Sequence, residues 1–110
     1  MSTTPQASTA AAALFGDLAP KLRALTEDTL FGDIWNRPAL SPRDRSLITC
    51  AALIASGQSA QLASHGPRAI ANGVSAEELE ELLTHLAFYC GWPRTLSGFT
   101  ALKPVIEAAK

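Results

Sequence analysis

Two histidines are the side chains of this sequence best suited to acid–base chemistry. His65 lies between Leu62 and Ala69 on the apolar side of one predicted helix, and His85 lies next to the leucine-rich side of another. Because a histidine titrates near neutral pH, either ring can serve as a general acid or base. The residues alone leave a second interpretation open, in which each ring packs in a core or an interface. No carboxylate or cysteine accompanies either histidine at ligand spacing, so no metal site is predicted.

Four arginines are candidates for binding an anionic substrate. Arg45 lies beside the buried side of its predicted helix, where it either pairs with an internal glutamate or binds a substrate carboxylate. Arg37 and Arg43 are expected to face solvent, and Arg68 follows His65 on the same predicted helix. The residue types alone do not separate a structural role for these arginines from a role in substrate binding.

Aromatic and thiol side chains form a third group of candidates. Trp35, Tyr89 and Trp92 are expected to pack in a core or an interface, from which they can also line a pocket. Cys50 is expected to be buried and Cys90 to lie at a helix end. Two cysteines are too few for a disulfide scaffold, and a redox pair would require them to lie close together. A thiol enzyme therefore remains an alternative.

Helices are expected to carry all of these side chains. Apolar residues recur at helical spacing along most of the chain, and no segment alternates like a half-buried strand. The pattern predicts an all-α fold of about six helices. Its helical stretches cover residues 10–30 with a break at Pro20, Ser41 to Gly57, Ser59 to Gly73, Ser75 to Gly91, and Pro93 onward.

The composition indicates one small domain that associates with itself. The chain has 110 residues, 47% of them hydrophobic, and a net charge of −1. A small domain buries a limited share of its surface, so this apolar excess predicts a homo-oligomer. The balanced charge disfavours a nucleic-acid or membrane-surface partner, and no apolar run reaches the roughly 20 residues of a membrane span. Residues 1–9 are expected to be a disordered tail before a single domain over residues 10–110. The start lacks a basic cluster typical of a secretory signal, so a cytoplasmic location is expected.

Three segments together resemble the carboxymuconolactone decarboxylase family. They are Leu40-x-x-Arg43-x-Arg45-Ser46-Leu47-Ile48, then Leu62-x-x-His65-x-x-x-Ala69-x-x-x-Gly73-Val74-x-x-Glu77-Glu78, and finally His85-Leu86-Ala87-Phe88-Tyr89-x-Gly91-Trp92-Pro93. The resemblance covers about residues 28–105. It implies the all-helical fold of the alkyl hydroperoxidase D-like superfamily and assembly into a homo-trimer or homo-hexamer.

One branch of that superfamily is a peroxidase with a C-x-x-C pair before a histidine and an upstream glutamate. When His65 is placed on that histidine, Gln58 and Gln61 stand where the cysteines belong, and Ser46 stands where the glutamate belongs. Disulfide cycling requires two thiols, so this resemblance excludes a peroxidase of that type.

The other branch is a decarboxylase of γ-carboxymuconolactone in aromatic-compound breakdown, and its chemistry requires no cofactor or metal. The resemblance then implies that Arg45 binds carboxylates, His65 returns a proton to carbon as general acid, and Tyr89 stabilises the oxyanion. The alternative is a non-catalytic oligomeric ligand-binding or interaction protein on the same scaffold, and a less favoured one is a thiol-dependent antioxidant enzyme. Further residues expected to bind a small carboxylate or lactone substrate are Arg37, Arg68, Trp35, Trp92 and His85.

Overall fold

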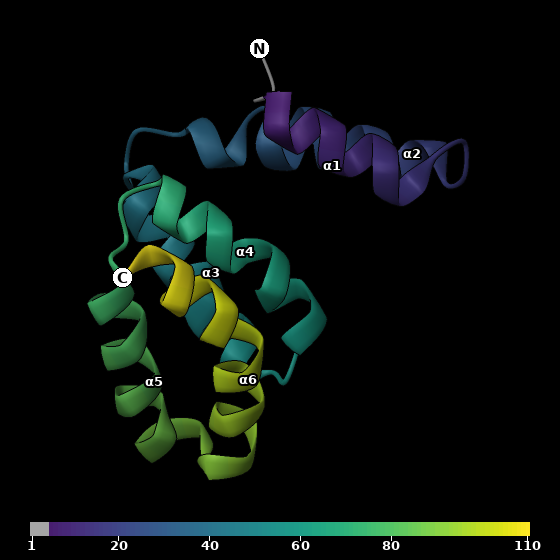
Figure 1. Ribbon diagram of the computed structural model, residues 1–110. Helices are drawn as coiled ribbons and strands as arrows, with labels where there is room; N and C mark the ends of the chain where they lie inside the picture. Colours follow the sequence, from purple (N-terminus) through teal and green to yellow (C-terminus); the bar gives the residue numbers. More distant parts are fainter. Residues whose placement is uncertain (1–4) are drawn as a thin grey trace. The chain divides into compact units, whose positions relative to one another are not determined.

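The computed structural model describes residues 5–110, and all of its regular elements are helical (Figure 1). No strand occurs in this described part of the chain, which confirms the predicted all-α fold with six α-helices. The elements fall into two compact units, an N-terminal unit that ends at Ser41 and a C-terminal unit from Pro42 to Lys110. In order they are α1 (Pro5–Phe15), α2 (Pro20–Ala24), the π-helical η1 (Leu25–Phe31), the 3₁₀ turn η2 (Ile34–Asn36), α3 (Pro42–Ala55), α4 (Ser59–Ala71), α5 (Ala76–Cys90) and α6 (Trp92–Ala109).

The N-terminal unit begins with helix α1. Helix α1 starts at Pro5, so residues 5–9 are helical, and the first four residues of the predicted tail lie outside the described residues. Proline is tolerated in the first turn of a helix, and the four alanines at positions 10–13 of α1 have the highest intrinsic helix propensity. The predicted break at Pro20 is confirmed, because α2 begins there after Ala19 adopts a left-handed conformation with φ 47°.

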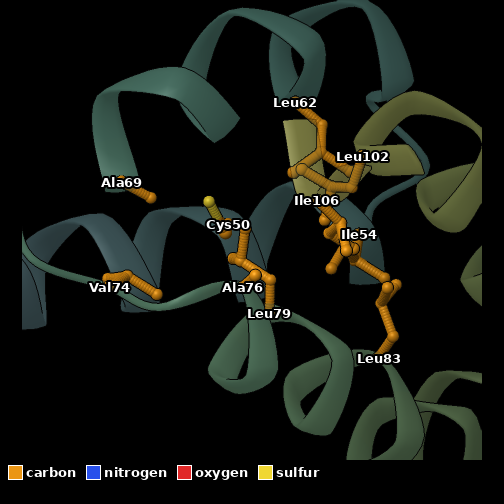
Figure 2. Packing of buried hydrophobic residues seen from close by; sticks show 10 residues of the cluster. All are labelled: Cys50, Ile54, Leu62, Ala69, Val74, Ala76, Leu79, Leu83, Leu102 and Ile106. Atoms are coloured by element: carbon orange, nitrogen blue, oxygen red, sulfur yellow. The ribbon is translucent and has the colours of Figure 1, made fainter. Parts of the chain in front are cut away.

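The C-terminal unit is built on two central helices. Both α3 and α6 pack against α4 and α5, and they also pack against each other. Their apolar sides enclose one core, shown in Figure 2, in which Ile54, Leu62, Leu79 and Leu102 are almost completely buried. The predicted helical spacing of apolar residues therefore identifies the sides of α3, α4, α5 and α6 that face inward.

A glycine allows α4 and α6 to approach closely. Gly66 is buried in α4, and a Cβ atom added to it would lie 2.8 Å from Cδ2 of Leu102 and 3.1 Å from Cγ2 of Val105. Helix α4 also continues through Pro67, which lacks an N–H group and therefore cannot make the usual backbone hydrogen bond. The turn of α4 that follows His65 therefore lies close against α6.

The start of α5 is fixed by a capping box. The Ser75 hydroxyl accepts a hydrogen bond from the Glu78 backbone N–H at 3.0 Å, and the Glu78 carboxylate accepts one from the Ser75 N–H at 2.9 Å. Gly91, with φ 91°, then ends α5 and directs the chain into α6. Within the described residues, none of the helices combines the length and apolarity needed to cross a bilayer.

Candidate active site

Helix α4 carries the strongest candidate pair, His65 and Arg68. The two residues are three positions apart, so they lie on the same side of the helix about one turn from each other. Both side chains are half-buried. Burial and, to a smaller extent, the nearby charge of Arg68 lower the pKa of His65. Burial also lowers the pKa of Arg68. A cation and a titratable ring are thus held together in a partly dehydrated place.

Helix α3 runs antiparallel to α4 beside this pair. The Cys50 thiol donates to the backbone carbonyl of His65 at 4.0 Å, and nearer the start of α3 the Asn72 side-chain amide donates to the Ser46 hydroxyl at 3.0 Å. These two contacts set the register between the helices. Arg45 immediately precedes Ser46, so it lies at the level of the end of α4, where Arg68 is found.

Buried nitrogen atoms occur on both helices of this contact. Nε of Arg45 and Nδ1 of His65 are each shielded from solvent, although both side chains are only half-buried as a whole. Arg45 was predicted to lie beside the buried side of its helix, and its position agrees with that expectation. The structure therefore brings Arg45, His65 and Arg68 to two helices that pack directly on each other.

Arg43 has a structural role. It forms ion pairs with Asp44 at 3.1 Å and with Glu78, so it links the first turn of α3 to the capping box of α5. Its side chain is half-buried, whereas the sequence predicted exposure to solvent. The carboxylates of Asp44 and Glu78 compensate its charge, which makes Arg43 a poor site for an incoming anion.

Ser46 and Asn72 form a polar contact that sequence reasoning did not anticipate. Ser46 is completely buried, and its hydroxyl accepts the hydrogen bond from Asn72, which follows the last turn of α4. From the sequence, only the end of the helix at Gly73, the residue after Asn72, was predicted. Asn72 lies three residues after Ala69, on the buried side of α4. A buried polar side chain needs a hydrogen-bond partner, so this spacing could have predicted the contact.

The second histidine occupies a different environment on α5. The rings of His85 and Tyr89 stack with centroids 4.8 Å apart, and Tyr89 is 78% exposed. His85 also borders a shallow groove of about 300 Å³ between α3 and α5, whose other lining residues include Glu78 and Glu81. Two carboxylates make this groove unsuited to an anionic substrate. Tyr89, which was predicted to be catalytic, therefore lies on an exposed side of α5. Helix α4, in contrast, packs against both α3 and α6.

Three further predicted binding residues are spread over the two units. Trp35 stacks on Phe31 within the N-terminal unit, with centroids 6.1 Å apart, and Arg37 follows η2 and is exposed. Trp92 begins α6, is 53% exposed and makes an edge-to-face contact with Phe88 at 5.2 Å. Trp35 and Arg37 thus belong to the N-terminal unit, and within the C-terminal unit Trp92 lies beside Phe88 at the start of α6.

The environment of Cys50 disfavours thiol chemistry. Cys50 is completely buried, and burial raises the pKa of its thiol to about 11. Cys90 is half-buried, with its sulfur 3.6 Å from the Thr95 hydroxyl. Since the thiolate is the reactive form, Cys50 is a poor nucleophile in the folded protein. In the part of the chain that the structure describes, no three His, Cys, Asp or Glu side chains gather to hold a metal ion.

Comparisons with known proteins agree with the predicted family. Residues 20–104 match the model of the carboxymuconolactone decarboxylase family. The chain is similar to 4-carboxymuconolactone decarboxylase of Acinetobacter baylyi, with 41% identity over 63 residues that cover 57% of this chain and 47% of that protein. It is also similar to nitrosuccinic acid decarboxylase npaB of Metarhizium robertsii, with 33% identity over 83 residues that cover 76% of this chain and 58% of that protein. The matched region thus spans about half the length of these relatives, and the family match covers most of this chain. The chain belongs to the carboxymuconolactone decarboxylase family.

Proposed function

We propose that this protein is a cofactor-independent decarboxylase of a small carboxylic acid. The observation that carries the proposal is the half-buried pair of His65 and Arg68, one helical turn apart on α4. The names of both relatives, which describe decarboxylases of two small acids, support the same reaction class. The matched region spans only about half of each relative, so the reaction class is inferred from the residues of this chain.

The reaction sets clear demands on a site. The bond between the carboxylate and its neighbouring carbon breaks, CO2 leaves, and the electron pair remains on that carbon. A group in the substrate must accept this pair, and a proton must then form a new C–H bond. The lactone carbonyl of γ-carboxymuconolactone and the nitro group of nitrosuccinic acid are both groups of this kind. We therefore propose a substrate in which the carbon that loses CO2 is bonded to such an electron acceptor or conjugated with it.

Arginine is suited to holding the carboxylates of this substrate. Arg68 is half-buried, and its guanidinium can form two parallel hydrogen bonds to a carboxylate. Arg45, at the same level on α3, is the candidate for a second carboxylate or for the oxygen that becomes negative. In a partly dehydrated site such contacts are stronger than in water, and they hold the substrate in one orientation.

His65 is suited to returning the proton, provided that it is charged when the electron pair forms. Burial and the charge of Arg68 lower its pKa, so the ring tends to be neutral in the empty site. A substrate carboxylate bound to Arg68 compensates that positive charge and adds a negative one. Substrate binding should therefore raise the pKa of His65 and lead to proton uptake. The protonated ring then transfers its proton to carbon.

Incubation with candidate substrates tests this function. We would mix the purified chain with γ-carboxymuconolactone or nitrosuccinic acid and follow ultraviolet absorbance together with CO2 release, with and without EDTA. Equal loss of substrate and release of CO2, unaffected by the chelator, is the expected result. Activity on the lactone would place the chain in aromatic-compound breakdown. Binding of either acid without any CO2 release would favour the ligand-binding alternative and overturn the proposal.

A further inference from the structure

One buried polar contact joins the two helices of the candidate site. Among residues 10–110, the polar side chains that are buried are those of Ser46 and Thr95. The Thr95 hydroxyl donates to the carbonyl of Gly91, at the start of its own helix, at 2.9 Å. The Ser46 hydroxyl instead accepts from Asn72, at the end of another helix, at 3.0 Å. A buried hydroxyl whose partner lies on a second helix ties the two helices together.

Asn72 belongs to the side of α4 that carries the proposed reactive pair. His65, Arg68 and Asn72 occupy positions i, i+3 and i+7, which fall on one side of a helix. The backbone N–H of Asn72 also donates to the carbonyl of Arg68 at 2.9 Å, so helical hydrogen bonding continues up to this residue. The contact with Ser46 therefore attaches to α3 the side of α4 on which His65 and Arg68 lie.

On α3 the contact ends next to the other arginine of the candidate site. Arg45 directly precedes Ser46 in the chain. From Ser46 the side-chain hydrogen bond leads to Asn72, and from Asn72 a backbone hydrogen bond leads to Arg68. Two hydrogen bonds and one peptide link thus connect the backbone of Arg45 to the backbone of Arg68.

The apolar packing around this contact is less able to fix the spacing of the two helices. Cys50 of α3 and Ala69 of α4 are completely buried in the core that both helices share (Figure 2). Apolar burial has no preferred direction, so a small slide of one helix along the other costs little. A hydrogen bond weakens with distance and misalignment, and a buried hydroxyl without a partner costs free energy. The Ser46–Asn72 hydrogen bond therefore penalises such a slide at the end of the contact where the arginines lie.

We propose that the Ser46–Asn72 hydrogen bond positions the two arginines of the candidate site, so that both can bind carboxylates of one substrate. This inference rests on the binding role that the proposed function gives to Arg45 and Arg68. Ser46 and Asn72 are positioning residues, because they act through the arginines and not on the substrate. A displacement of about 1 Å can weaken a site strongly. An acid with a single carboxylate needs only one arginine, so its binding should depend little on this hydrogen bond.

Two matched hydroxyl deletions and two simple acids test this proposal. Ser46→Ala removes the acceptor of the contact between the helices, and Thr95→Val removes the other buried hydroxyl, which bonds within its own helix. NMR titration of the full chain would give dissociation constants for succinate, which has two carboxylates, and butyrate, which has one. Ser46→Ala should weaken succinate binding roughly 10-fold and butyrate binding less than about twofold. Thr95→Val should change neither by more than about twofold.

Removal of the donor should have the same effect as removal of the acceptor. Asn72→Ala should weaken succinate binding by the same factor as Ser46→Ala, and the double variant should lose no more than either single variant. On an acid that the chain decarboxylates, KM should rise by this factor while kcat changes less than about threefold. Circular dichroism would verify the helix content of each variant. If Ser46→Ala loses helix content, Asn72→Ala, at a half-buried position, carries the same comparison.

Several outcomes would overturn the positioning role. Equal weakening of succinate and butyrate binding by Ser46→Ala, or the same pattern in Thr95→Val, would indicate a general loosening of the fold. A wild type that binds succinate no more tightly than butyrate would show that the two arginines do not act together. Turnover by Ser46→Ala at the wild-type KM would overturn the positioning role alone. If succinate binding depends on Ser46 as expected but no CO2 is released from either candidate substrate, the positioning role stands and the decarboxylase proposal fails.

Discussion

The C-terminal unit has one histidine on α4 and one on α5, and each has a second polar or aromatic partner about one turn further along its helix. His65 and Arg68 are half-buried, and the pKa of His65 is lowered by burial and by Arg68. His85 and Tyr89 stack in contact with solvent, and Tyr89 is 78% exposed. The two pairs are equally plausible from residue type and spacing. Their surroundings alone distinguish a place where electrostatics are strong from one where water weakens them.

The packing of the two helices explains this difference. Helix α4 lies against both α3 and α6, and Gly66 lets α6 approach its backbone next to His65. Helix α5 also contacts α3 and α6, yet the side with His85 and Tyr89 points away from the core. A histidine that follows the inward side of its helix is therefore dehydrated, and one on the outer side is not. If the proposed function is correct, only the α4 pair should matter for the chemistry.

Removing the two imidazoles should give the largest contrast. His65→Ala removes the proposed general acid, which typically contributes about 100- to 10,000-fold to a rate, so kcat should fall by roughly that factor. His85→Ala should change kcat less than about threefold, because an exposed ring is not part of the site. The measurement is the initial rate of CO2 release at saturating substrate. Equal losses in both variants, with unchanged circular dichroism, would contradict the distinction between the helices.

The two cysteines differ in burial in the same way as the two histidines. Cys50 donates to the carbonyl of His65 and is completely buried, and its pKa is raised to about 11. At pH 8 this pKa allows a thiolate fraction of only about one in a thousand. A thiol reagent should therefore modify Cys90 first in native protein and Cys50 only after unfolding. The check is mass spectrometry of peptides after timed labelling, with the Cys90→Ser variant as control. Rapid labelling of Cys50 in that native variant would show that the α3–α4 contact opens easily.

Fold and site differ in how far they can be predicted from this sequence. The helices were predictable because apolar spacing, proline positions and the Ser75 capping box are local signals. The start of α1 at Pro5 had no local signal of the same kind, because residues 5–9 are small and polar and have no apolar periodicity.

The site was less predictable, because its environment depends on residues distant in the sequence. The local apolar pattern placed His65 on the inward side of its helix and Arg45 beside the inward side of its own helix. The structure agrees with both positions. The exposure of Tyr89 and the acidic groove near His85 could not be predicted in this way, since both depend on how α5 packs against α3. The hydrogen bond from Asn72 to Ser46 joins residues 26 positions apart. Only the packed structure reveals such a contact.

Arg68 offers a smaller and more specific test of the α4 pair. Arg68→Gln removes a charge-assisted contact, so KM for a dicarboxylate should rise roughly 10- to 100-fold. It also removes one cause of the lowered pKa of His65, so this pKa should rise, yet remain below 6.5 because burial, the larger cause, persists. An NMR titration of the His65 ring checks the shift, and Arg94→Gln, which removes an exposed cation from α6, is the control.

The lowered pKa of His65 should also make the folded protein less stable at acidic pH. The native state holds the pKa of His65 below its ordinary value of 6.5, so the unfolded chain binds this proton more readily. The His65 contribution to stability is therefore present above about pH 6.5 and is lost as the pH falls towards the lower native pKa. Arg68→Gln should reduce this loss. If the variant loses stability on acidification as steeply as the wild type, Arg68 does not act on His65.

The smallest expected effect concerns the helix that we place outside the chemistry. Ser75→Ala removes the capping hydrogen bond at the start of α5 and should lower the free energy of unfolding by about 1 kcal/mol. Ser59→Ala at the start of α4 is a matched control, because the cap position there is Gln58 and makes no side-chain hydrogen bond to the helix. Urea denaturation gives both stabilities, and kcat/KM is measured on the same samples. Because Ser75 acts only on the stability of α5, its loss should leave kcat/KM unchanged. A fall in kcat/KM well beyond the unfolded fraction would mean that the position of α5 matters for the reaction, and that its exposed pair of His85 and Tyr89 cannot be separated from the site on α4.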